Sequence, residues 1–307
     1  MSRKSTGRSV KKTSSRKKAG QTSPSRFLKS VIAAALTSFG IATAWLHPQG
    51  LNWQSFEPLL ASLGWPTAVQ QDSAPVPAAI DGYVQTSFAQ CPQFFPGSRP
   101  VVPMAYTQRE LCFSSFAILH SGQTKTPVFV VQRLNRQQIQ SAKGLKRTDR
   151  FYAEGRLPQS ERAELNDYRG SGFSRGHMAP AGDMASEQSM AQSFSLANMV
   201  PQNQIHNAGP WNKIEADTRK YVARAAGNVY VFTGPVYERN AATIGSSQVA
   251  VPSHLFKLVY DATTRRAWVH WQGNQASTRV GPPISYEEFV RRTGLHLLPD
   301  FSLKTSG

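Results

Sequence analysis

The stretch "FSRGHMAP", Phe173–Pro180, places an arginine, a glycine and a histidine in consecutive positions. Arg175 carries a planar set of N–H donors that matches phosphate oxygens. His177 is mostly neutral at pH 7, because the ordinary pKa of histidine is about 6.5. Gly176 permits a positive φ or a close approach of the backbone to a ligand. Alone, an Arg-Gly-His sequence is more typical of a surface turn, so its function depends on what accompanies it.

A second polar segment, "NAGPWNKIE", runs from Asn207 to Glu215. Asn207, Trp211 and Glu215 are spaced four apart, so on a helix they share one face. Pro210 has no backbone N–H, and the helix is therefore expected to begin or bend near it. We assign Trp211 to the core. Asn207 and Glu215 offer the oxygen ligands with which Mg²⁺, retaining several waters, is held in proteins.

Together the two segments contain the parts needed for hydrolysis of a phosphodiester. His177 would serve as general base, Arg175 would neutralise phosphate charge, and Asn207 with Glu215 would hold a metal ion. Activity is then expected to rise between about pH 5.5 and 7.5, as the histidine loses its proton. Each residue also has an ordinary structural interpretation: Asn207 as a helix cap, and Glu215 as a surface residue paired with Arg219.

Three motifs with matching spacing resemble those of the DNA/RNA non-specific endonuclease family, the ββα-metal (His-Me finger) nucleases that include the mitochondrial endonuclease G type. They are "SRGH" (Ser174–His177), "NMVPQ" (Asn198–Gln202) and "NAGPWNKIE" (Asn207–Glu215). The segment "VFTGPVYE" (Val231–Glu238) is similar to the one that follows in the family. The resemblance covers roughly residues 85–303. Many members have Asp where this chain has Ser174, which would alter the orientation of the histidine.

The resemblance implies an α+β domain with the ββα-metal fold, a central and mainly antiparallel sheet, and flanking helices. It makes His177 the general base, Asn207 the direct protein ligand of Mg²⁺ or Mn²⁺, and Glu215 a residue that orients metal-bound water. Arg175 would support the phosphate or the geometry of the site. The remaining expected site residues are Asn198 and Gln202, which would hold the site by hydrogen bonds, and a phosphate-clamping arginine at Arg147 or Arg150, with Arg150 favoured.

Runs of β-branched and aromatic residues bounded by turn residues predict strands. These runs are Thr126–Leu134, Asn228–Gly234, His254–Ala262 and Arg266–Gly273. Phe194–Gln202 is expected to be the second strand of the ββα unit. Helices are expected at Ile214–Ala226 and after Ser285, which with Glu288 has capping-box spacing and precedes a stop at Gly294.

The N-terminal third of the chain has a different composition. Residues 1–26 are rich in Ser, Lys and Arg and are expected to be a disordered basic tail. Residues 27–46 are mostly apolar and are expected to be either a transmembrane signal-anchor helix or a cleaved signal peptide. Residues 47–84 read as a Pro/Gln/Ala-rich linker before a domain at 85–303. Either interpretation of 27–46 places that domain outside the cytoplasm, at the bacterial inner membrane facing the periplasm or secreted.

Charge and cysteine content bear on compartment and substrate. Ten of the 35 Lys and Arg lie in residues 1–30, which contain no acid, leaving 25 basic against 18 acidic residues. This excess favours a polyanionic partner. In an exported protein Cys91 and Cys112 would form a disulfide. The chain is therefore expected to be an exported, metal-dependent, sequence-nonspecific endonuclease acting on DNA, RNA or both. The alternatives are a membrane-tethered nucleic-acid-binding or uptake protein with a degenerate site and a hydrolase of another phosphodiester. The family also allows a homodimer.

Overall fold

The structure is a computed structural model that describes residues 82–105 and 107–299. The expected basic tail (1–26), the apolar segment (27–46) and the linker as far as residue 81 lie outside the described residues. No helix within the described ranges is both long enough and apolar enough to cross a membrane.

Strands and short helices alternate along the described chain. The strands are β1 (Tyr83–Gln85), β2 (Val101–Pro103), β3 (Gln108–Cys112), β4 (Ala117–Ser121), β5 (Thr126–Leu134), β6 (Phe173–His177), β7 (Met199–Asn203), β8 (Val229–Val236), β9 (Thr243–Ile244), β10 (Val249–Ala250), β11 (His254–Asp261) and β12 (Arg266–Gly273). The helices are α3 (Arg136–Ala142), α4 (Glu187–Ser193), α5 (Gln204–His206), α6 (Asn212–Val222) and α7 (Tyr286–Thr293).

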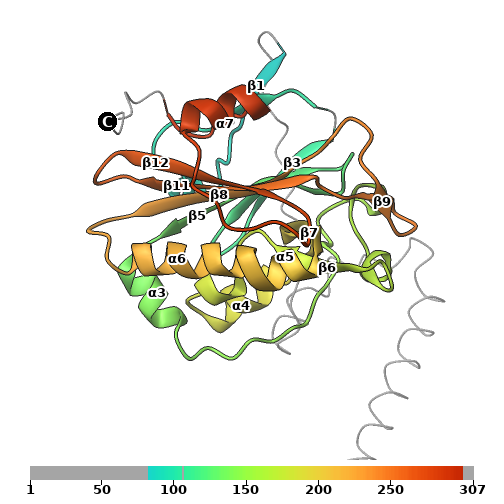
Figure 1. Cartoon of the computed structure of the whole chain (residues 1–307), viewed down its shortest axis with the longest axis horizontal. Coiled ribbons are helices and arrows are strands. Elements are labelled where there is room, and N and C mark those ends of the chain that lie inside the picture. The colour runs from blue at the N-terminus through green and yellow to red at the C-terminus, as the bar shows by residue number, and fades with distance from the viewer. Residues whose placement is uncertain (1–81, 106, 300–307) are drawn as a thin grey trace, which may run out of the picture. The chain divides into compact units, whose positions relative to one another are not determined.

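Six of the described strands form one sheet in the order β12-β11-β8-β5-β4-β3, and every neighbouring pair is antiparallel. In Figure 1, α3, α4, α5 and α6 lie on one face of this sheet, and α7 lies on the other. The expected α+β class with a central antiparallel sheet and flanking helices is confirmed.

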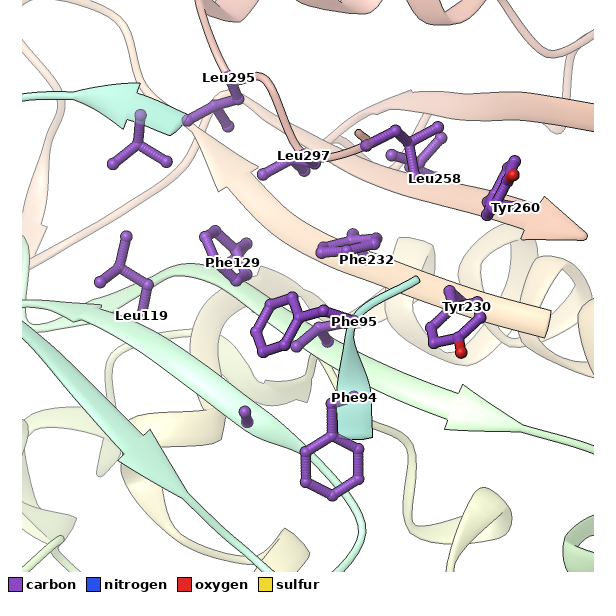
Figure 2. Close-up of a cluster of buried hydrophobic side chains, with 14 of the residues drawn as sticks. Phe94, Phe95, Leu119, Phe129, Tyr230, Phe232, Leu258, Tyr260, Leu295 and Leu297 are labelled. Carbon is purple, nitrogen blue, oxygen red and sulfur yellow. The ribbon is translucent and has the colours of Figure 1, made fainter. Parts of the chain in front are cut away.

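The central strands β5, β8 and β11 are mostly apolar and mostly buried because both faces of the sheet are covered. On the α7 face, alternate residues Phe129 of β5, Phe232 of β8 and Phe256 of β11 join one buried cluster. Figure 2 shows Phe95, from the segment after β1, beside Phe129 and Phe232, and Phe94 belongs to the same cluster. The N-terminal part of the described chain therefore completes one side of the core.

On the opposite face, the intervening residues pack against the segments that carry the polar motifs. Val130 of β5 and Leu255 of β11 contact a cluster that includes Phe194, Trp211 and Ile214. Trp211 is fully buried, as expected. This face is therefore the one on which the ββα unit rests.

Several sequence expectations hold at the level of single residues. β5 and β12 have the expected bounds. The side chain of Ser285 accepts a hydrogen bond from the backbone N of Glu288, and Gly294 ends α7 in the left-handed conformation with φ of 69°. The expected disulfide joins Cys91 to Cys112, so it ties the segment after β1 to the edge strand β3.

Candidate active site

A two-stranded ribbon and the helices that follow it form the ββα unit. β6 pairs antiparallel with β7, and His177 lies opposite Met199. The expected second strand, Phe194–Gln202, is corrected: β7 begins only at Met199. The preceding residues form a 3₁₀ turn, Leu196–Asn198, because Ser195 caps it by accepting a hydrogen bond from the backbone N of Ala197.

Gly176 is required for a different reason from the one its motif suggests. It does not have a positive φ, and no ligand is needed to explain it. A Cβ built at position 176 would lie 2.1 Å from Oε1 and 2.6 Å from Cβ of Gln202, which is fully buried against it. The glycine therefore makes room for the Gln202 side chain, whose Nε2 lies 3.1 Å from His206 Nδ1.

Asn198 holds the chain that follows His177. It is fully buried, and its Oδ1 accepts a hydrogen bond from the backbone N of Ala179 at 2.8 Å. Its Nδ2 donates to Ala179 O at 2.9 Å and to Ser193 O at 2.8 Å. Asn198 thus joins the segment after β6 to the end of α4.

The helix that carries Asn207 and Glu215 changes its pitch. After α5 the residues Asn207–Trp211 form a π-helical turn, and α6 continues to Val222. The wider turn accommodates Pro210, which would clash with a carbonyl oxygen in an α-helix interior. The spacing of four predicts that Asn207, Trp211 and Glu215 share one helix face. In the structure Asn207 and Glu215 border a cavity, whereas Trp211 between them is buried in the core.

Residues of the first motif, Ser174–His177, and of the third, Asn207–Glu215, meet at one cavity of about 330 Å³. The lining consists of Arg147, Arg175, His177, Pro180, Ala181, Gly182, Asn207, Ala208, Asn212, Glu215 and Arg219. Of the expected residues, the structure therefore brings together His177, Arg175, Asn207 and Glu215. Arg147 lines the cavity and Arg150 does not, so the geometry favours the arginine that the sequence ranked second.

His177 sits in an apolar pocket at the edge of this cavity. Its ring lies edge-on to Phe194, with centroids 5.1 Å apart, and 5.8 Å from the ring of Phe151. Burial, with a further contribution from the charge of Arg147, lowers its pKa to about 3. Nε2 is buried and has no hydrogen-bond partner in the described residues.

This pKa corrects the expected pH dependence, because an imidazole neutral down to about pH 3 cannot itself produce a rise in activity between pH 5.5 and 7.5.

Arg175 is held in place by its neighbours. Its guanidinium lies 5.0 Å from the ring centre of Phe151 and 5.5 Å from that of Tyr168. One terminal nitrogen donates to Leu165 O at 3.1 Å. Arg147 is more exposed and pairs with Asp149. The guanidinium of Arg147 also lies 5.2 Å from the ring centre of Phe194, so both arginines of the cavity wall have partners within the protein.

Buried charges lie beneath the cavity. Burial raises the pKa of Glu215 to about 7, an effect that the charge of Lys257 opposes. Lys257 is 1% exposed, donates to Thr233 Oγ1 at 2.8 Å and lies 5.3 Å from the ring centre of Trp211. The i+4 pairing of Glu215 with Arg219 is not the one observed, since Arg219 pairs with Asp183 at 3.0 Å.

Sequence reasoning missed three residues of this polar layer. Asp183 belongs to the same "SRGHMAPAGDM" segment as His177, and a carboxyl group so close to the motif could have been named as a candidate site residue. Lys257 is the one Lys, Arg, Asp or Glu inside the largely apolar run "HLFKLVY". A lysine at such a position could have been predicted to be a buried charge. Asn212 lines the cavity only because the π-helical turn rotates it there, and the sequence carries no signal for that.

The donor set fits a hydrated divalent ion better than a tightly ligated one. The described residues contain no group of three or more His, Cys, Asp and Glu that could hold a metal. Asn207 and Glu215 instead offer one amide and one carboxylate on the wall of a cavity with space for water. Mg²⁺ is bound in this manner, with few protein ligands.

The fold and the cavity define a ββα nuclease-type site on an antiparallel sheet, and comparison with known proteins agrees. The sequence profile of the DNA/RNA non-specific endonuclease family matches residues 97–295. The chain belongs to that family, whose members are enzymes.

Individual proteins similar to this chain include mitochondrial nucleases. The mitochondrial nuclease EXOG of Xenopus laevis is 36% identical over 213 residues, which cover 62% of this chain and 53% of the relative. Human mitochondrial endonuclease G is 34% identical over 156 residues, covering 47% and 52%. The solved complex of EndoG with EndoGI matches with a TM-score of 0.56 and 26% identity, covering 68% of this chain and 90% of that one. The chain spans about half the length of the curated relatives.

Proposed function

We propose that this protein is a metal-dependent, sequence-nonspecific endonuclease that hydrolyses phosphodiester bonds of DNA, RNA or both. One observation carries the proposal: His177 of one motif and Asn207 with Glu215 of another border the same cavity of about 330 Å³. Three arginines, Arg147, Arg175 and Arg219, line it as well. A base, two oxygen ligands and several cations around one polar space suit a phosphodiester better than an uncharged substrate.

The proposed mechanism assigns a separate task to each residue. His177 accepts a proton from the attacking water, and its lowered pKa keeps the imidazole neutral for that role. Arg175 and Arg147 donate hydrogen bonds to the non-bridging phosphate oxygens. Asn207 and Glu215 would hold Mg²⁺ or Mn²⁺. When bound, that ion supplies Lewis-acid stabilisation of the charge that develops on phosphate and leaving oxygen.

Sequence-independent binding is consistent with the charge of the chain. The residues after position 30 keep an excess of basic over acidic residues, and contacts to phosphates alone carry no sequence information. Binding is therefore expected to weaken steeply as the salt concentration rises. The two nucleic acids share this backbone chemistry, and parallel assays on each will separate them.

A nicking assay tests the proposal on the purified full-length chain. Supercoiled plasmid and single-stranded RNA are incubated with the protein, with and without EDTA and over a titration of Mg²⁺ and Mn²⁺. We expect metal-dependent cleavage that His177→Ala lowers by at least about a hundredfold. His296→Ala, at an exposed histidine outside the cavity, is the matched control and should cleave normally. Binding without cleavage at any metal concentration would instead favour the nucleic-acid-binding or uptake protein.

We also propose that the described domain acts outside the cytoplasm. Two features support this: the apolar segment 27–46 follows a basic tail, and Cys91 and Cys112 form a disulfide. A reporter fused after residue 84, active only in the periplasm, tests the location. A reporter active only in the cytoplasm would contradict it. N-terminal sequencing of the mature protein distinguishes a retained anchor from a cleaved signal peptide.

A further inference from the structure

Asn274, just after β12, lies outside the cavity and forms hydrogen bonds with two other segments of the chain. It is 8% exposed. Its Nδ2 donates to Pro201 O at 3.0 Å and to Pro252 O at 2.9 Å, and its Oδ1 accepts from the backbone N of Asn203 at 2.8 Å. Its backbone N donates to Ser253 O at 2.8 Å. Buried amide groups that are fully bonded in this way fix the segments they join.

The bonded segments belong to different parts of the fold. Asn203 and Pro201 are in β7 of the ββα unit. Pro252 and Ser253 directly precede β11, and Asn274 directly follows β12. One side chain thus attaches the end of β7 to the edge of the central sheet.

The end of β7 is the start of the helix that carries Asn207. Oδ1 of Asn203 accepts hydrogen bonds from the backbone N of Ile205 and of His206, both at 3.1 Å, and so caps α5. The π-helical turn begins one residue later, at Asn207. Asn274 binds the backbone N of the capping residue, Asn203. Fewer than two helical turns separate Asn203 from Asn207, so a shift of Asn274 would also shift Asn207.

His177 is fixed independently. It lies opposite Met199, at the other end of the ribbon from Asn203, and Asn198 holds the backbone at Ala179 beside it. Two buried asparagines therefore support the two halves of the cavity: Asn198 the histidine side, and Asn274 the Asn207 side.

From this arrangement we propose that Asn274 is a positioning residue for Asn207, and that it sets metal affinity without acting on His177. The inference rests on the proposed function, in which Asn207 is a metal ligand. Residues that orient a ligand from outside the coordination sphere contribute about 10- to 100-fold to metal affinity. A residue with a purely structural role would change thermal stability and leave the affinity of the folded protein unchanged.

The test measures Mn²⁺ binding by calorimetry on the full-length chain, together with hydrogen exchange of backbone amides. Asn274→Ala is expected to weaken Mn²⁺ binding about tenfold or more and to speed exchange at Ile205 and His206. Ser285→Ala is the control on the opposite face of the sheet, where Ser285 caps α7: exchange should speed at Glu288, with Mn²⁺ affinity unchanged. If Asn274→Ala does not fold, Asn274→Asp keeps the acceptor for Asn203 N, loses both donated bonds, and should show a loss in the same direction.

The outcomes separate the inference from the proposed function. Unchanged Mn²⁺ affinity in a folded Asn274 variant, while Asn207→Ala abolishes binding, overturns the inference alone. Absence of Mn²⁺ binding by the wild-type chain overturns the metal site of the proposed function. In that case exchange at Ile205 and His206 decides the positioning claim: faster exchange in the Asn274 variant supports it, and unchanged exchange overturns it.

Discussion

Gln202 packs so closely on Gly176 that a Cβ at position 176 would lie 2.1 Å from Gln202 Oε1. The two residues sit on adjacent strands of the ribbon that carries Arg175 and His177. The side chain of Gln202 therefore leaves no room for any residue larger than glycine at position 176.

Gly176→Ala is accordingly expected to destabilise the protein by about 1–3 kcal/mol, the usual cost of overpacking, and to reduce cleavage by displacing His177. Denaturant unfolding measures the first effect and plasmid nicking the second. Gly155→Ala is the control, because a Cβ there meets no atom within 4 Å. Adding Gln202→Ala to Gly176→Ala should recover part of the stability. Equal effects of the two single glycine substitutions would contradict this account.

Stability should fall in acid because buried histidines must remain neutral. Burial lowers the pKa of His120 to about 4, while its Nε2 lies 2.8 Å from Glu161 O. Its folded-state pKa is below the ordinary value of about 6.5, so its contribution is complete above that pH and is lost as the pH falls toward 4. The loss amounts to at most about 1.4 kcal/mol per pH unit for this proton. Unfolding followed from pH 7 to 4.5 should show a shallower slope for His120→Gln than for wild type or the exposed control His296→Gln. Parallel curves would refute the assignment.

The disulfide is expected to contribute substantially to stability. Cys91 and Cys112 are 21 residues apart, and closing a loop of that size restricts the unfolded chain by about 3 kcal/mol. The double variant Cys91→Ala/Cys112→Ala should lose about that amount in denaturant unfolding. Reductant should destabilise the wild-type chain and leave the double variant unchanged. A wild-type chain indifferent to reductant would show that the bond contributes nothing.

Lys257 is expected to act on Glu215 through its charge. Its own pKa is lowered by burial, with Glu215 and Asp183 opposing that change. Lys257→Met, which keeps the buried volume, should raise the pKa of Glu215 further above its ordinary range, as read from carboxyl carbon shifts in the metal-free protein. Lys213→Met removes an exposed lysine of α6 that pairs with Asp217 and should leave Glu215 unaffected. A Glu215 titration identical in the Lys257 variant and wild type would dismiss the coupling.

The sequence predicted elements well where local chemistry determines them. Thr126–Leu134 is bounded by turn residues and apolar on both faces, so its limits were readable, and Ser285 and Gly294 mark α7 by capping chemistry. Motif spacing also identified His177 and Asn207 as neighbours of one cavity.

Side-chain partners were less predictable, because they depend on segments distant in sequence. Arg219 pairs with Asp183 rather than Glu215, and Arg147 rather than Arg150 reaches the cavity. β7 begins late because Ser195 caps the 3₁₀ turn before it. The largely apolar stretch around Ser195 predicted a continuous strand instead. Predictions for residues 1–81 fall outside the described chain.

The π-helical turn at Asn207–Trp211 has a consequence for how such a site can change. Trp211 and Ile214 seat α6 on the sheet, while Asn207 lies on the other side of the widened turn. Removing one residue from the turn would rotate Asn207 by about 100° about the helix axis without unseating α6. The direction of Asn207 relative to α6 can thus change through chain length alone, without a substitution at Asn207.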